Sequence, residues 1–212
     1  MLELLAPAGN LDAVIAAVQN GADAVYMGFG DGFNARRSAD NFTRESFAKA
    51  VRYCHIRGCK VYVTLNTLVG DREMDAAAAL AQQASDAGAD AILVQDLGLA
   101  RVLRAALPDI PLHASTQMSI HNLAGVEAAA EMGITRAVLA RELSLEQIRF
   151  ISQHASIETE VFVHGALCFC YSGQCYMSAL IGRRSGDRGA CAQPCRMQYS
   201  MGGRMDEYPL SL

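Results

Sequence analysis

The sequence lacks a hydrophobic run long enough to cross a membrane, because none of its apolar stretches reaches the roughly 18 to 20 residues that a spanning helix needs. The N-terminus also lacks the basic segment followed by an apolar one that marks a secretory signal. We therefore expect a cytoplasmic protein without a membrane span. Positive charge is not in excess, since 18 Lys and Arg stand against 22 Asp and Glu, a net charge of −4. This argues against a surface built entirely to coat nucleic acid but allows a local basic patch.

Three common catalytic motifs are absent as well. Without His-Glu-x-x-His, a zincin-type hydrolase is unsupported, and without Gly-x-Ser-x-Gly there is no serine nucleophile elbow. No Gly-x-Gly-x-x-Gly follows the first expected strand, which argues against dinucleotide binding. Gly28, Gly30 and Gly32 form a glycine-rich stretch with a different spacing, and we interpret it as a flexible loop.

Short apolar runs alternate with amphipathic stretches in a chain that is 51% apolar. The runs are continuous rather than alternating in polarity, as in strands covered on both faces of a parallel sheet. Helix start signals stand between them: Asn10, Thr43 and Asn122 are candidate N-caps, and Ser144 with Gln147 fits a capping box. The expected strands are 3–6, 24–28, 60–66, 91–95, 111–115, 136–140 and 160–164.

The strand–helix unit contains an internal sequence repeat, because Gly21-Ala-Asp-Ala24 recurs as Gly88-Ala-Asp-Ala91. Such repeats predict either a doubly wound sheet or a (β/α)8-type TIM barrel. Polar residues at successive strand ends favour the barrel, whose active sites lie on that rim. We expect one barrel domain over 1–212, but the chain has only about seven strands and a complete barrel needs about 250 residues. We therefore expect either that the eighth unit is missing, because the chain is truncated at its C-terminus, or that the barrel is open.

Several of these rim residues are candidates for catalysis or substrate binding. His113, Glu142 and His164 could act as acids or bases, while Asn66 and Gln117 could orient a carbonyl group or a base edge. Each also has a plain structural interpretation: His113 as a satisfied histidine, and Glu142 as a partner of its neighbour in the sequence. Both interpretations stay open at this point.

Most of the chemical information lies in the cysteine-rich and arginine-rich segment 165–205. Five of the seven cysteines fall within 28 residues. In a reducing compartment, clustered thiols favour a metal site over disulfides, and thiolates suit zinc or iron–sulfur clusters. Their spacing matches neither a zinc ribbon nor a ferredoxin. The alternative is a set of buried or unpaired thiols, as we expect for Cys54 and Cys59. The five cysteines are Cys168, Cys170, Cys175, Cys191 and Cys195.

The same segment is locally basic. Residues 183–204 contain five arginines against Asp187, a local charge of +4. Arginine forks suit phosphates or carboxylates, so RNA or a dicarboxylate would fit. The alternative is a solvated loop or pairing with Asp206 and Glu207. Tyr171, Tyr176 and Tyr199 could stack on bases or pack in the core. The arginines we expect to bind substrate are Arg183, Arg184, Arg188 and Arg196.

The stretch Glu160-x-Phe162-x2-Gly165-Ala-Leu-Cys168-x4-Gly173-x-Cys175-x-Met177-Ser178 resembles the signature of the collagenase-like peptidase family of unassigned catalytic type. Further stretches that resemble the family run from the start of the chain, Leu5-Ala-Pro-Ala-Gly9, through 21–28 and 113–117 to 188–196. The resemblance therefore extends over essentially the whole chain.

The resemblance implies a bacterial barrel domain with one of two activities. One is proteolysis of the collagenase type. The other is oxygen-independent or prephenate-linked hydroxylation of a tRNA uridine, a ribosomal RNA cytidine or a ubiquinone precursor, with four cysteines holding an iron–sulfur cluster of the 4Fe-4S kind. By motif position the resemblance implies Cys168, Cys175 and Cys191 as ligands, and the fourth is either Cys195 or a residue after Leu212.

Our interpretation is an RNA hydroxylase, with tRNA or ribosomal RNA as its partner. A protease is the alternative, for which Cys168 and His164 form a conceivable nucleophile–base pair. A third possibility is a non-catalytic iron–sulfur assembly module or a partner in quinone hydroxylation. A protein partner or a homo-oligomer is compatible with all three.

Overall fold

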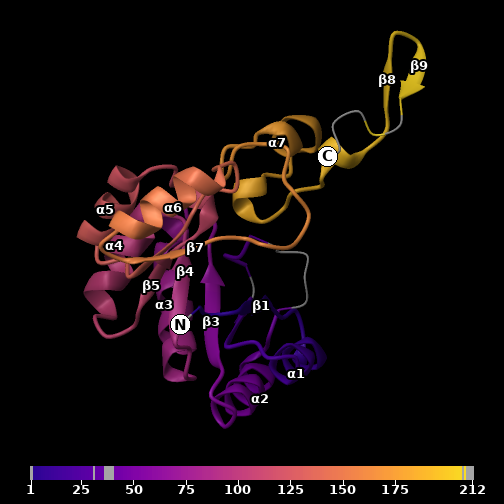
Figure 1. Cartoon of the computed structure of the whole chain (residues 1–212). Helices are drawn as coiled ribbons and strands as arrows, with labels where there is room; N and C mark the ends of the chain where they lie inside the picture. The colour runs from indigo at the N-terminus through magenta and orange to yellow at the C-terminus, as the bar shows by residue number, and fades with distance from the viewer. Residues whose placement is uncertain (1, 31, 36–40, 207, 209–212) are drawn as a thin grey trace.

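Strands and helices alternate along the chain in the order that the sequence predicts (Figure 1). The computed structural model describes residues 2–30, 32–35, 41–206 and 208. The alternating elements are β1 Leu5–Pro7, α1 Leu11–Gln19, β2 Ala24–Met27, α2 Arg44–His55, β3 Lys60–Leu65, α3 Met74–Asp86, β4 Ala91–Val94, α4 Leu97–Ala106, β5 Leu112–Ala114, α5 Leu123–Glu131, β6 Arg136–Val138, α6 Leu145–His154 and β7 Glu158–Glu160.

The four predicted helix starts are confirmed. Asn10 accepts a hydrogen bond from the Ala13 amide at 2.9 Å, and Asn122 does the same for Gly125 at 2.8 Å. Thr43 caps α2, and Ser144 with Gln147 forms the capping box of α6. Each cap satisfies an amide that the first helical turn leaves unpaired, an interaction that stabilises a helix by about 1 kcal/mol.

The strands form one parallel sheet in the order β1-β2-β3-β4-β5-β6-β7. Successive residues of a strand point to opposite faces, so β3 sends Val61 and Val63 outward and Tyr62 inward. The outward residues pack against the helices that return the chain from one strand to the next. This arrangement explains why the strands read as continuous apolar runs in the sequence.

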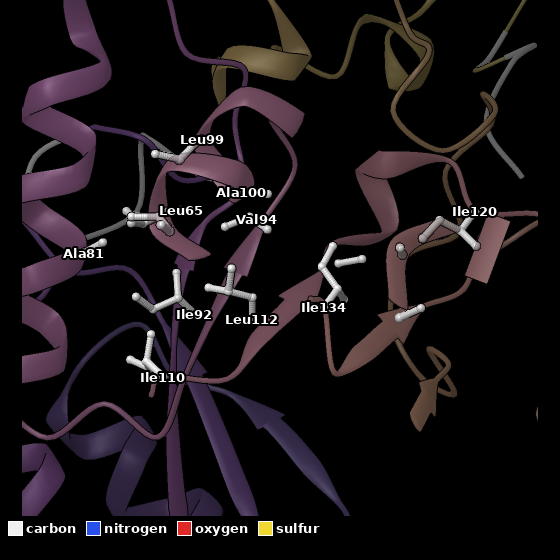
Figure 2. Packing of buried hydrophobic residues seen from close by; sticks show 14 of the residues in the cluster. Leu65, Ala81, Ile92, Val94, Leu99, Ala100, Ile110, Leu112, Ile120 and Ile134 are labelled. Carbon is white, nitrogen blue, oxygen red and sulfur yellow. The ribbon is translucent and has the colours of Figure 1, made fainter. Parts of the chain in front are cut away.

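The main core lies between the sheet and the helices of its second half. Ile92 and Leu112 of the sheet are fully buried, as are Leu99 and Leu103 of α4 (Figure 2). Burying a side chain of this size stabilises the fold by about 1.5 to 3 kcal/mol. The sheet is therefore held by its outer face, which leaves the inner face free to carry polar groups.

The inner face carries a charged group at the amino-terminal end of the strands. Arg136 on β6 donates both to Glu3, which precedes β1, and to Glu158 on β7. The Tyr62 hydroxyl donates to Glu3 at 2.9 Å. Glu3 and Arg136 lie 133 residues apart in the sequence, so this group draws the two ends of the sheet toward each other.

The sheet is curled but not closed, because β1 and β7 are its two edges and no strand pairs between them in the described part of the chain. The predicted seventh strand, 160–164, is wrong in its position. The ladder with β6 ends where Val138 pairs with Glu160, and the chain then leaves the sheet. Val163 is 85% exposed, so this apolar run is not a buried strand.

Residues after β7 form a separate layer over the carboxyl ends of the strands (Figure 1). It contains the short helix α7 Met177–Gly182 and two single turns, 186–188 and 194–196. An antiparallel hairpin of β8 Tyr199–Met201 and β9 Arg204–Asp206 follows and projects away from the sheet (Figure 1). None of the helices described has the length and the apolar character that crossing a membrane requires.

Candidate metal centre at the carboxyl rim

Two stretches of the layer after β7 bring the clustered cysteines together. The first carries Cys168, Cys170 and Cys175, and the second carries Cys191 and Cys195. The Ala192 amide donates to Ser178 Oγ at 2.9 Å, which fastens the second stretch to the first just beyond Cys175. A second tie runs from Arg196 to the carbonyl oxygen of Leu167, also at 2.9 Å. These two hydrogen bonds hold the stretch that carries Cys191 and Cys195 against the one that carries Cys168 and Cys175.

The thiols are close enough to influence one another. Burial raises the pKa of Cys170, and the nearby thiols of Cys175 and Cys168 raise it further. The pKa of Cys195 is raised in the same way by burial and then by Cys168, Cys191 and Cys175. Cysteine sulfurs are soft ligands, so the residue types gathered here suit a thiophilic metal or an iron–sulfur cluster. In the described part of the chain, no group of three or more His, Cys, Asp or Glu side chains is placed to hold a metal ion.

The two remaining cysteines lie elsewhere. Cys54 lies in the last turn of α2 and Cys59 precedes β3, and both are buried among apolar side chains. Burial raises the pKa of Cys54 to about 12, an effect that the neighbouring Cys59 reinforces. The prediction that these two are core thiols is confirmed.

Of the predicted acid–base residues, Glu142 alone lies beside the cysteine layer and is engaged there. Its carboxylate accepts hydrogen bonds from the Ser172 amide at 3.0 Å and from the Ser172 hydroxyl at 2.9 Å. His121 Nε2 lies 2.7 Å from the same carboxylate. Burial opposes ionisation of Glu142, but these hydrogen bonds hold its pKa below the ordinary value. A carboxylate held ionised in this way is better suited to holding the loop at Ser172 in place than to transferring a proton.

The structure does not bring His113 to the rim. This residue is the central residue of β5, is 4% exposed and packs edge-on against Tyr62 at a ring distance of 4.9 Å. Burial, assisted by Arg136, lowers its pKa to about 3. It faces a hollow of about 560 Å³ shared with Lys60 and Glu158, which lies at the opposite end of the strands from the cysteines.

His164 is also displaced from the predicted strand end. It is exposed and follows the end of β7 by four residues, so neither His164 nor Cys168 lies at the strand end. Within the described residues, neither side chain has a hydrogen-bond partner. Cys168 and His164 therefore do not form a hydrogen-bonded nucleophile–base pair in this structure.

Asn66, one of the two predicted polar rim residues, lines a small cavity of about 50 Å³. Asn66 donates to Ser115 Oγ at 3.2 Å and accepts from the Ala35 amide at 2.9 Å. Glu160 lines the same cavity, and burial raises its pKa. Gln117 follows β5, and its Oε1 is buried without a partner among the described residues. Sequence reasoning missed Glu160, although the family-like signature begins with it.

Arg188 is the most firmly engaged of the four predicted substrate-binding arginines. Its guanidinium binds both carboxylate oxygens of Glu73, at 2.5 and 2.7 Å, and the carbonyl oxygen of Leu68 at 2.7 Å. Arg184 and Arg196 each donate to a backbone carbonyl. Arg183, at the end of α7, is exposed. Pairing with Asp206 or Glu207 falls outside the side chains that the structure describes.

A curled parallel sheet with helices on its outer face defines an α/β fold of the TIM-barrel type. The fold has a solved counterpart in the U32 peptidase Mk0906, with a TM-score of 0.65 and 16% identity over 78% of this chain and 70% of that one. Residues 9–209 match peptidase family U32, and the chain belongs to this family.

The curated relatives carry names of two kinds. The 23S rRNA 5-hydroxycytidine C2501 synthase of Escherichia coli is 44% identical over 94% of this chain, and the tRNA hydroxylation protein P1 of Bacillus subtilis is 41% identical over 94%. A protein of Porphyromonas gingivalis named collagenase is 36% identical over 94%. This chain spans only 30%, 47% and 50% of these three relatives, respectively.

Proposed function

We propose that this chain is most of the barrel domain of an iron–sulfur enzyme that hydroxylates a base of tRNA or ribosomal RNA. The observation that carries the proposal is that hydrogen bonds join the two cysteine-bearing stretches over the carboxyl rim, where barrel enzymes have their active sites. The two relatives named for RNA hydroxylation support the choice of substrate.

Cys168, Cys175 and Cys191 would hold the cluster, with Cys195 or a residue of a longer chain as the fourth ligand. Bound there, the cluster would supply one-electron transfer. The unpaired state of all seven cysteines fits a reducing compartment such as the cytoplasm. The bound cluster and the free cysteines can both be measured directly on purified protein.

Groups around the cysteines suit an RNA substrate. Phe169, Tyr171 and Tyr176 are each more than half exposed, so their rings are free to stack on unpaired bases. Arg183 and Arg184 add positive charge beside them, for a phosphate or for the carboxylates of a co-substrate such as prephenate. These residues would bind and orient the base over the rim.

We also propose that the complete protein closes the sheet into a (β/α)8 barrel. β1 and β7 both present unpaired edges, and an eighth strand between them would satisfy their backbone groups. The greater length of the relatives leaves room for such a strand.

The test is anaerobic purification of the full-length gene product, followed by iron and sulfide analysis and a visible absorbance spectrum. We expect bound iron that is lost in Cys168→Ala, Cys175→Ala and Cys191→Ala variants and kept in Cys59→Ala, whose thiol lies in the core. Deletion of the gene should remove one hydroxylated nucleoside from tRNA or ribosomal RNA, as measured by mass spectrometry. A protein that stays free of iron after anaerobic reconstitution would overturn the cluster.

The family name and the collagenase relative favour a second candidate, a peptidase. The structure gives little support for a peptidase. Ser172 is a serine whose hydroxyl donates to a carboxylate, and it is fully buried. Gelatin cleavage that disappears in Cys168→Ser would support it. Bound iron together with an unchanged nucleoside profile would instead favour the assembly or quinone-hydroxylation role.

A further inference from the structure

Ser172 is a buried residue in the middle of an exposed loop. It lies two residues after Cys170 and three before Cys175, and none of its surface is exposed. Its neighbour Tyr171 is 66% exposed. A single polar residue that turns inward from such a loop fixes the point at which the loop touches the sheet.

All three polar groups of Ser172 are bound by residues that follow β5 and β6. Its amide and hydroxyl donate to the two carboxylate oxygens of Glu142, and its hydroxyl oxygen accepts from Arg141 Nε at 3.1 Å. Its carbonyl oxygen accepts from the Ser119 hydroxyl. The loop is therefore held by backbone and side chain at once, which restricts both its position and its rotation.

His121 completes this contact from the other side. Its Nε2 lies 2.7 Å from Glu142 and its Nδ1 lies 2.6 Å from the Ser119 carbonyl oxygen. The ring therefore joins the carboxylate that binds Ser172 to the backbone of Ser119, whose hydroxyl also binds Ser172. Closed sets of hydrogen bonds like this one rigidify the groups they connect.

The backbone makes a second close contact beside Ser172. Gly173 has φ +71°, and a Cβ atom there would lie 2.0 Å from the carbonyl oxygen of Gln117. The loop thus lies directly against the turn after β5, with no space for a side chain between them. This contact fixes the position of the backbone between Cys170 and Cys175.

We propose that Ser172 and Glu142 are positioning residues that set where Cys168, Cys170 and Cys175 stand over the rim. This inference rests on the proposed function for its purpose, since orienting ligands through their neighbours is what tunes a metal site. Glu142, first considered as a catalytic residue, then acts through Ser172 rather than on the substrate. Ser172 itself is no nucleophile, because it is buried and its hydroxyl donates its proton in a hydrogen bond to the carboxylate of Glu142.

The first test uses the reduced, metal-free full-length protein and measures how fast each cysteine reacts with iodoacetamide, read by mass spectrometry. We expect Ser172→Ala and Glu142→Gln to speed alkylation of Cys170 and Cys175 several-fold and to leave Cys54 protected. The matched control is Glu127→Gln, because Glu127 binds the amide and hydroxyl of Ser156 in the same way on another part of the surface. This control should leave all rates unchanged.

The second test measures the reconstituted protein by its loss of iron to a chelator and by its electron paramagnetic resonance spectrum. Loss of an outer partner weakens metal binding about 10- to 100-fold, so we expect loss that is faster by this factor and an altered spectrum in both variants. The double variant should change little beyond either single one, since both break the same contact.

The outcomes separate the inference from the proposed function. Unchanged alkylation rates in both folded variants would overturn the positioning role, whether or not iron binds. Faster alkylation in a protein that never binds iron would confirm the positioning role and defeat the cluster. If Ser172→Ala does not fold, Glu142→Gln, which removes charge but not volume, decides alone.

Discussion

Arg136 Nη1 lies 2.5 Å from Oε1 of Glu3, so a residue of the sixth strand binds one that precedes the first strand across the inner face of an open sheet. Their side chains are 9% and 22% exposed. Both edges of the sheet are connected to this pair, because Arg136 also binds Glu158 on β7.

Replacement of Glu3 by Gln should therefore destabilise the protein by roughly 3 kcal/mol, because it leaves the mostly buried charge of Arg136 short of a partner. Urea unfolding of the full-length protein measures the change. Lys49→Ala removes the exposed Lys49–Glu45 pair and should leave the free energy of unfolding almost unchanged, because solvent screens the two charges. Equal effects of the two substitutions would contradict the bridging role of Glu3.

The burial of His113 predicts a pH dependence of stability. Its pKa is about 3 in the folded protein against 6.5 for the unperturbed group, so the unfolded state takes up the proton first as the pH falls. Stability from this residue is fully present above pH 6.5 and is lost progressively as the pH falls toward 3. The difference in unfolding free energy between the wild type and His113→Asn should therefore shrink as the pH is lowered from 6.5 toward 3. A constant difference would show that His113 is not buried in its neutral form.

Gly173 allows the cysteine loop to lie against the sheet. Gly173→Ala should displace the loop, since the added Cβ meets a backbone oxygen and the positive φ costs about 1 to 2 kcal/mol. Hydrogen exchange of residues 168–176 should become faster. Gly182→Ala is the control, because a Cβ there meets nothing within 4 Å and should leave the exchange unchanged.

The arginines of the segment should separate into two classes. Arg183→Ala should weaken RNA binding and lower the salt dependence of binding by about one counterion, because Arg183 is exposed in the layer that carries the cysteines. Arg188→Ala should instead lower the thermal stability of the layer after β7, because it breaks the bond to Glu73. Fluorescence anisotropy with a tRNA and a thermal melt measure the two effects. Arg52→Ala, on the distant helix α2, should change neither.

The order of the strands, the helix caps and the family were all accessible from the sequence alone. These features depend on local patterns: a buried parallel strand must be continuously apolar, and a cap needs its side chain within three residues of its partner. The same locality identified Cys54 and Cys59 as core thiols and the other five cysteines as one group.

The contacts that assemble the site were not accessible in this way. Ser172 meets Glu142 across 30 residues, and Arg188 meets Glu73 across 115. The end of β7 was misjudged because Val161 to Val163 have the composition of a strand but no neighbour to pair with. The sequence by itself determined which helices and strands form, because these follow from local patterns. Only the tertiary structure decided which carboxylate binds which partner, because the packing of distant loops on the rim selects among many possible partners.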